Sequence, residues 1–236
     1  MPPDVMALRE RAGELTGWAI APAVRAVSRA RGARMFHPEG RTFAAEVTPL
    51  DATLGPRLAG PALVRLSAAL WRKGFPYLDV LGIAIRFGWS APDHGDQDLL
   101  FATMPSPLML ALAPFTTRAG NYFANRFWGV APFDAEGFGR VKLRLVPRHQ
   151  PTGGTREEIL DLAVRRGIAV WDLEVRRVLR LGWRKIARVV LLDEVNIDQS
   201  RLRFSPFLDG RGLRPVGLVH AIRKATYRAS QLGRGA

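Results

Sequence analysis

The chain has 236 residues, of which 47% are hydrophobic, and its six Trp and twelve Phe are typical of a globular protein and exclude a disordered one. It contains no cysteine, which excludes disulfides, iron–sulfur clusters and Cys-based metal sites. The net charge is +14, from 35 basic and 21 acidic residues. The arginines are spread along the chain without a nucleic-acid-binding motif, so no nucleic-acid partner is expected.

Residues 1–33 are predicted to form an amphipathic helix. Apolar residues recur there among Arg and Glu, namely Leu8, Leu15, Trp18, Ile20, Val24 and Val27. The same region lacks the apolar core and small-residue cleavage site of a signal peptide. No apolar run in the sequence approaches the ~18–20 residues needed to span a bilayer. The sequence therefore predicts a cytoplasmic protein without a transmembrane segment.

Short runs typical of β-strands follow, many with period-two alternation of apolar and polar residues. They are Thr42–Thr48, Ala62–Ser67, Gly82–Phe87, Asp98–Thr103, Arg140–Val146, Ala169–Arg177, Lys185–Leu192 and Arg201–Ser205. About eight strands in a chain of this length predict an eight-stranded antiparallel β-barrel over residues 34–207, because closure leaves no sheet edge exposed. With flanking α-helices, the expected fold class is α+β.

Two further helices are expected. The first begins at Thr155, the N-cap of a capping box with Glu158 at the third helical position. The second runs over residues 215–232, and Pro215 suits its first turn. Arg223 and Tyr227 are four residues apart on it and share one face. Because no linker or repeat interrupts the sequence, residues 1–236 are predicted to form a single domain.

Tyr227 is the first candidate for chemistry. A phenolate can bind ferric iron, but a free Tyr has a pKa near ~10, so a cation must stabilise the anion. Arg223 lies one helical turn away and does not lose its proton. Taken alone, this spacing is more often found where a Tyr packs on the core with its hydroxyl at the surface.

His37 is the second candidate, because it stands just before the strand predicted from Thr42. A His at the mouth of a barrel strand can point into a pocket. There its imidazole can move a peroxide proton from one oxygen to the other, first as general base and then as general acid. The ordinary alternative is a His at the surface or one satisfied in the core.

Segments along most of the chain, from residue 34 to the end, share their order and spacing with a known family. They are Arg34-Met35-Phe36-His37-Pro38-Glu39-Gly40, Glu46-Val47-Thr48, Val64-Arg65-Leu66-Ser67, Gly82-Ile83-Ala84-Ile85-Arg86-Phe87, Asp98-Leu99-Leu100 to Pro105, Asn121-Tyr122-Phe123, and finally Arg223, Tyr227 and Arg234. Together these segments resemble the catalase-like family of haem proteins, which implies a catalase-like core.

The resemblance implies haem b with ferric iron as the cofactor. Tyr227 would be the axial iron ligand, and Arg223 would stabilise its phenolate. His37 would be the distal acid–base residue, and Ser67 would donate a hydrogen bond that orients it. The haem propionates would pair with Arg34, Arg65 and Arg234.

The sequence also departs from the family pattern. The family's distal Asn is missing from the segment Phe101–Pro105, where Thr103 is the nearest polar substitute. Phe36, in the expected cofactor pocket beside His37, is bulkier than the Val usual there. Full catalases are longer, with an arm and a C-terminal domain, and we expect this chain to supply only the barrel. We therefore expect a haem-dependent peroxidase that reduces hydrogen peroxide or organic hydroperoxides, with an electron donor as its second partner.

Several alternatives stay open. Within the haem class they are a weak catalase and an enzyme that rearranges fatty-acid hydroperoxides, of the allene oxide synthase kind. From other classes they are a non-catalytic protein that binds or senses haem, and a basic nucleic-acid-binding barrel without haem. A homodimer is the expected oligomer.

Overall fold

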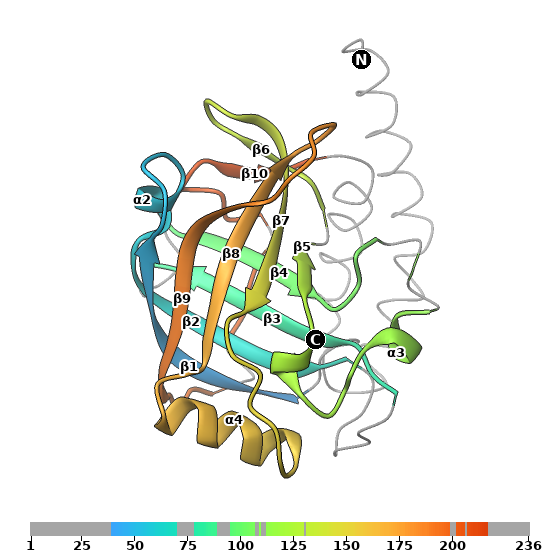
Figure 1. The fold of residues 1–236 in the computed structure, drawn as a ribbon. Coiled ribbons are helices and arrows are strands. Elements are labelled where there is room, and N and C mark those ends of the chain that lie inside the picture. The colour runs from blue at the N-terminus through green and yellow to red at the C-terminus, as the bar shows by residue number, and fades with distance from the viewer. Residues whose placement is uncertain are drawn as a thin grey trace, which may run out of the picture.

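The structure, a computed structural model, describes residues 39–69, 78–88, 95–106, 109, 112–129, 131–198, 202–205 and 207–216. Its dominant feature is a single antiparallel sheet that closes on itself (Figure 1). The eight strands of the closed ring are β1 (Glu39–Pro49), β2 (Gly60–Ala68), β3 (Leu81–Phe87), β4 (Gln97–Ala102), β5 (Phe127–Gly129), β7 (Gly139–Pro147), β8 (Val170–Arg177) and β9 (Arg184–Glu194). Two further short strands, β6 (Phe133–Ala135) and β10 (Leu213–Pro215), extend outward from β7.

Each strand of the ring pairs with the next in that order, and β9 returns to pair with β1. Closure satisfies the backbone donors and acceptors that an open sheet would leave at its two edges. The predicted eight-stranded antiparallel barrel is therefore confirmed.

The barrel interior is filled with apolar side chains. Alternate residues of each strand point inward, as the pleat requires, and in β2 these are Ala62, Val64 and Leu66, all part of the main core. The largest fully buried side chains include Trp171 of β8, whose ring stacks on Phe123 with centroids 4.8 Å apart. Because the interior is packed, the surfaces left for a ligand among these strands lie on the outer face of the barrel.

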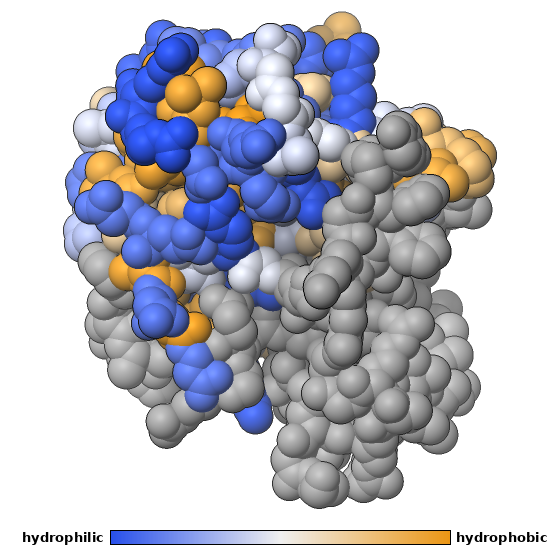
Figure 2. All heavy atoms as spheres, turned by 90° about the horizontal axis from the view of Figure 1, so that it is seen from below, coloured by the Kyte–Doolittle hydropathy of each residue, from blue (hydrophilic) through white to orange (hydrophobic). Residues whose placement is uncertain are grey.

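Short helices lie around the barrel. They are α2 (Gly55–Leu58), α3 (Ala113–Thr116), the 3₁₀ turn η2 (Tyr122–Ala124) and α4 (Arg156–Arg165). Helix α4 packs Ile159, Leu160 and Ala163 onto the core at one end of the barrel (Figure 1). The described residues seen from below in Figure 2 are mostly hydrophilic, with scattered apolar side chains among them.

Helix α4 begins where the sequence predicted. The Thr155 hydroxyl accepts a hydrogen bond from the Glu158 amide, 3.3 Å away, and the Glu158 carboxylate accepts one from the Thr155 amide at 2.7 Å. Both halves of the capping box are present, so this prediction is confirmed. No helix within the described ranges is long and apolar enough to cross a membrane.

Seven of the predicted strands are confirmed, and the eighth is wrong. Residues 202–205 form no strand. Instead, Leu202 and Phe204 are buried in a small cluster with Leu63, on the outer side of β2. Their alternation, which predicted a strand, reflects a segment that covers the barrel without pairing to it.

Other differences concern short elements and the chain ends. Strands β5, β6 and β10 were not predicted, because three residues carry too little periodicity. Pro215 does not begin a helix: it ends β10, where it is paired with Phe133. Proline is tolerated there because β10 lies at the end of the strand order and pairs only with β6. The predicted N-terminal helix, and residues 217–232 of the C-terminal one, lie outside the described residues.

Candidate functional site

The structure describes three of the predicted site residues, and all three are buried. Arg65 is 3%, Ser67 5% and Thr103 6% exposed. The other six are Arg34, Phe36, His37, Arg223, Tyr227 and Arg234, and they lie outside the described residues. The site can therefore be built from the strands that carry Arg65, Ser67 and Thr103.

Arg65 and Ser67 lie on the outer face of β2. Their neighbours Val64 and Leu66 belong to the barrel core, and successive side chains of a strand point to opposite faces. Both residues have polar partners in the fold. A buried guanidinium stays charged, so this part of the outer face carries a fixed positive charge away from bulk water.

A row of small residues crosses the outer face beside Arg65. Gly40 of β1 is paired with Ser67, Ser67 with Gly82 of β3, and Gly82 with Ala102 of β4. Residues paired across strands share a face, so these four lie side by side over four neighbouring strands. Three strand spacings make the row about 14 Å long, and its side chains are too small to project far from the sheet. We call these four residues the small-residue row.

Gly40 is required by the position of Arg65. A Cβ atom on Gly40 would lie 2.7 Å from the Arg65 guanidinium carbon and 2.6 Å from the Leu66 carbonyl oxygen. Both separations are shorter than real Cβ contacts. The Arg65 side chain therefore lies directly over the β1 backbone at Gly40, which is three residues after His37 in the sequence.

The Thr103 hydroxyl is occupied within the protein. It accepts a hydrogen bond from the Leu81 amide at 3.1 Å and lies 2.7 Å from the Thr117 hydroxyl. The Thr117 hydroxyl donates to the Ala113 carbonyl at 2.8 Å, so the hydrogen between the two threonines belongs to Thr103. Thr103 thus ties the end of β4 to β3 and α3, and this geometry gives no support to its expected role as a donor to a ligand.

Tyr122 is the one tyrosine within the described ranges. It is buried, and the Arg156 guanidinium carbon lies 5.5 Å from its ring centroid. Burial raises the pKa of Tyr122 far above that of free Tyr, and the nearby Arg156 and Arg65 oppose this only in part. Tyr122 therefore stays a neutral phenol at physiological pH and is a poor candidate for a phenolate ligand.

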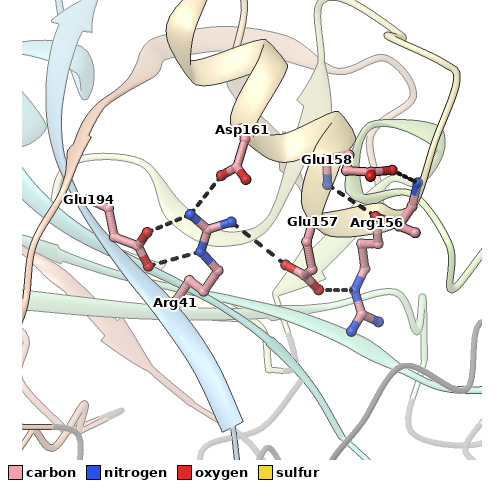
Figure 3. Close-up of polar contacts among 7 residues, drawn as sticks. Arg41, Arg156, Glu157, Glu158, Asp161 and Glu194 are labelled. Carbon is pink, nitrogen blue, oxygen red and sulfur yellow. Dashed lines mark hydrogen bonds and ion pairs between the residues drawn. The ribbon is translucent and has the colours of Figure 1, made fainter.

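A network of ion pairs fixes the start of β1 next to Gly40 (Figure 3). Arg41 Nε donates to Glu194 Oε1 of β9 at 2.9 Å, and its Nη2 lies 2.7 Å from Asp161 Oδ1 of α4. Glu157 joins Arg41 to Arg156, with a Glu157 Oε1–Arg156 Nε distance of 3.0 Å. Hydrogen bonding, chiefly to Glu194, raises the pKa of Arg41 above its ordinary value, although burial opposes the shift.

Sequence reasoning did not find the Arg41 network. Its partners are 120 and 153 residues away in the chain, and only the barrel register shows that they meet. The network fixes the position of β1, the strand that follows His37, because its ion pairs tie β1 to both α4 and β9. The described ranges contain no cluster of three or more His, Asp or Glu side chains placed to hold a metal ion.

Comparison with known proteins does not assign this chain to a family. Neither a family model nor a curated protein matches this chain.

Proposed function

We propose that the chain is a haem-dependent peroxidase that reduces hydrogen peroxide or organic hydroperoxides. One observation carries the proposal. Gly40, Arg65, Ser67 and Gly82 come from three separate segments of the catalase resemblance, and they lie side by side on neighbouring strands of a closed barrel. The resemblance needs these segments on one face, and the register between β1, β2 and β3 is compatible with that arrangement.

The described residues fit a flat, anionic cofactor. A planar macrocycle needs a face without bulky side chains, and the small-residue row has none of its own, although Ser67, Gly82 and Ala102 are buried and the Arg65 guanidinium lies over Gly40. Arg65 places a buried cation beside this row, where a propionate carboxylate would form a charge-assisted hydrogen bond. By the resemblance, Arg34 and Arg234 would hold the propionates with it, and Phe36 would pack against the macrocycle.

The iron ligand has to come from outside the described ranges. Tyr122 is kept protonated by burial, which argues against it as the source of a phenolate. The resemblance assigns the ligand to Tyr227, with Arg223 one helical turn away to favour its charged form. Haem b, when bound, supplies the two-electron redox chemistry that reduction of a peroxide requires.

Side chains of the protein would transfer the protons that peroxide reduction requires. Reduction of a hydroperoxide to an alcohol and water consumes two electrons from a reductant and two protons. His37 would take the hydroperoxide proton and return it to the leaving oxygen, so that a neutral molecule departs. Ser67 would donate a hydrogen bond to His37, which fixes the imidazole tautomer and the direction of proton transfer.

An absorption spectrum with and without hemin tests the cofactor and its ligand. We expect the wild type to bind hemin with the high-spin ferric spectrum of tyrosinate ligation, and Tyr227→Phe to lose it. Tyr122→Phe is the matched control, because it removes a phenol hydroxyl that is not ionised, and it should leave the spectrum unchanged. Full hemin occupancy in Tyr227→Phe would contradict the assignment of the ligand, and a protein that takes up no hemin would refute the proposal.

Products distinguish the reactions open to a haem-loaded protein. We expect alcohol formation that depends on an added electron donor. Oxygen release from hydrogen peroxide would instead indicate a catalase, and loss of a fatty-acid hydroperoxide without a donor would indicate a rearranging enzyme. Bound haem with no peroxide reactivity would indicate a carrier or sensor. In His37→Ala we expect hemin binding to persist while peroxide cleavage slows.

A further inference from the structure

The hairpin that joins β8 and β9 carries the most exposed large apolar side chains of the described residues. Leu179 and Leu181 are 99% and 98% exposed, and they stand two residues apart at its tip. Leu179 has a φ of 71°, a left-handed conformation that a bulky side chain rarely adopts. Scattered exposed leucines are ordinary, but two of them so close together on a strained tip indicate a contact surface.

The same hairpin is rich in cations. Residues 175–192 contain six basic residues and no acidic one. Arg184, Lys185 and Arg188 are paired with carboxylates on neighbouring strands or loops. The other three, Arg176, Arg177 and Arg180, form no ion pair among the described residues, and Arg177 and Arg180 are exposed. We call residues 176–185 the Arg–Leu hairpin.

A hollow lies at the base of the Arg–Leu hairpin. Its volume is about 360 Å³, and it is lined by Phe138, Val175 and four arginines. Of these arginines, Arg177 and Arg184 lie over the Phe138 ring, with guanidinium carbons 5.3 and 5.2 Å from its centroid. The hollow thus has an apolar wall and a rim of guanidinium groups, which suits a phosphate-bearing headgroup.

We propose that the Arg–Leu hairpin docks onto bilayers that contain anionic phospholipids. Leu179 and Leu181 enter the boundary between headgroups and acyl chains, and the arginines of the hollow bind lipid phosphates. Trp183 lies just behind the tip, beneath Arg144 and Arg176, with its ring centroid 4.2 and 4.8 Å from their guanidinium carbons. This packing holds the hairpin in place behind its two leucines.

A nucleic-acid surface fits these observations less well. Bases stack on open aromatic faces, whereas the Trp183 and Phe138 rings already carry arginines. On a nucleic acid, Leu179 and Leu181 at the tip of the hairpin would contact only phosphates, so their apolar surface would not be buried favourably. In a bilayer the same leucines leave water, so lipid accounts for both the charged and the apolar parts of the hairpin.

Flotation of the purified full chain with vesicles tests this proposal. We expect binding to vesicles of phosphatidylcholine with phosphatidylglycerol, and little binding to phosphatidylcholine alone. The double variant Arg177→Gln with Arg180→Gln should weaken binding about 25-fold, because each cation near an anionic surface contributes a factor of about five. Leu179→Ser with Leu181→Ser should weaken it by at least about tenfold, because this variant keeps every charge but loses the apolar insertion.

The matched control separates docking from the general attraction of a basic protein. Arg165→Gln with Arg166→Gln removes two exposed cations at the C-terminal end of α4, which lies at the opposite end of the barrel (Figure 1). This control should bind almost as well as the wild type. Equal losses in the control and the hairpin variant would overturn the proposal, and so would unchanged binding by the leucine variant.

Two further readouts keep the result unambiguous. Circular dichroism of each variant should match the wild type, since the substituted side chains are exposed. If a labelled DNA or RNA duplex binds in a way that depends on Arg177 and Arg180 while vesicles do not, the surface is a nucleic-acid site and the lipid proposal is refuted. None of these measurements needs haem, so their outcome is independent of the proposed peroxidase function.

Discussion

Substitution of Gly40 by Ala tests the packing on which the candidate site depends. The new Cβ would lie 2.6 Å from the Leu66 carbonyl oxygen, whereas ordinary contacts begin at 3.4 Å. The β1 and β2 backbones must therefore separate by about 0.8 Å to relieve this contact, and the Arg65 guanidinium, 2.7 Å from the new Cβ, must also shift from its place over β1. Forced overpacking of this kind costs about 1–3 kcal/mol, which outweighs the small entropic gain of replacing a glycine.

Urea unfolding followed by tryptophan fluorescence measures this cost, because Trp171 is buried and stacked on Phe123. Gly129→Ala is the matched control, since its Cβ would meet the movable Phe133 ring edge at 3.2 Å and needs only a slight adjustment. We expect Gly40→Ala to lower the free energy of unfolding by about 1–3 kcal/mol and Gly129→Ala to lower it by under about 1 kcal/mol.

Equal stability of the two variants would refute the reasoning about Gly40. The same variant also has a consequence for the proposed function. If Arg65 holds a propionate, then displacement of its guanidinium should weaken hemin binding in Gly40→Ala but not in Gly129→Ala. Hemin affinity that is unchanged in Gly40→Ala, together with the expected loss of stability, would count against Arg65 as a haem-binding residue and leave the packing argument intact.

Three more predictions follow from polar contacts. Asp98→Asn should lower the free energy of unfolding by about 3–5 kcal/mol, because it leaves the buried Arg86 without its carboxylate at 2.8 Å. Replacing both residues by Leu should recover only part of that loss, because the Ser205 amide and the Arg203 carbonyl lose their partners, and no recovery in urea unfolding would contradict this account. Thr155→Ala should lower the free energy of unfolding by about 1 kcal/mol, because α4 loses its N-cap. Urea unfolding should show a lowered midpoint, and an unchanged midpoint would mean that the cap does not stabilise the fold. Burial tends to raise the pKa of Asp51, but hydrogen bonds from Thr53 and Gly55 outweigh this effect and lower the pKa. The contribution of Asp51 to the free energy of unfolding is therefore complete above the ordinary Asp pKa near ~4, and it is lost as the pH falls further. The difference in unfolding free energy between the wild type and Asp51→Asn should accordingly shrink below pH ~4, and a difference that stays constant to lower pH would rule this out.

The long strands could be predicted from sequence because their inward residues follow one another with period two. In β7, Val141, Leu143 and Leu145 are buried and alternate with more exposed Lys142 and Arg144, which is the pattern that predicted the strand. The same rule failed at residues 201–205. Leu202 and Phe204 alternate equally well, but they are buried against the outside of the barrel and form no ladder. Periodicity shows which residues are buried, but not whether their backbone has a strand to pair with.

The candidate site was predictable where it depends on spacing within one strand. Arg65 and Ser67 are two residues apart, so they had to share a face once β2 formed. The small-residue row and the Arg41 network depend on register between strands, which local sequence does not determine without the connecting turns. The partners of the Thr103 hydroxyl likewise depend on how β4 meets α3: its hydrogen goes to Thr117, a contact that the local sequence does not predict.

The pairing of β1 with β9 has a consequence for how the chain folds. These strands join residues 43–49 to residues 187–194, so the ring closes only through contacts between distant parts of the sequence. Closing so long a loop is entropically unfavourable, and folds dominated by such contacts fold slowly, on timescales of about milliseconds to seconds. During synthesis β1 remains an open edge until β9 has left the ribosome. Over that interval, the β1 edge is one of two open edges at which two nascent chains can pair with each other.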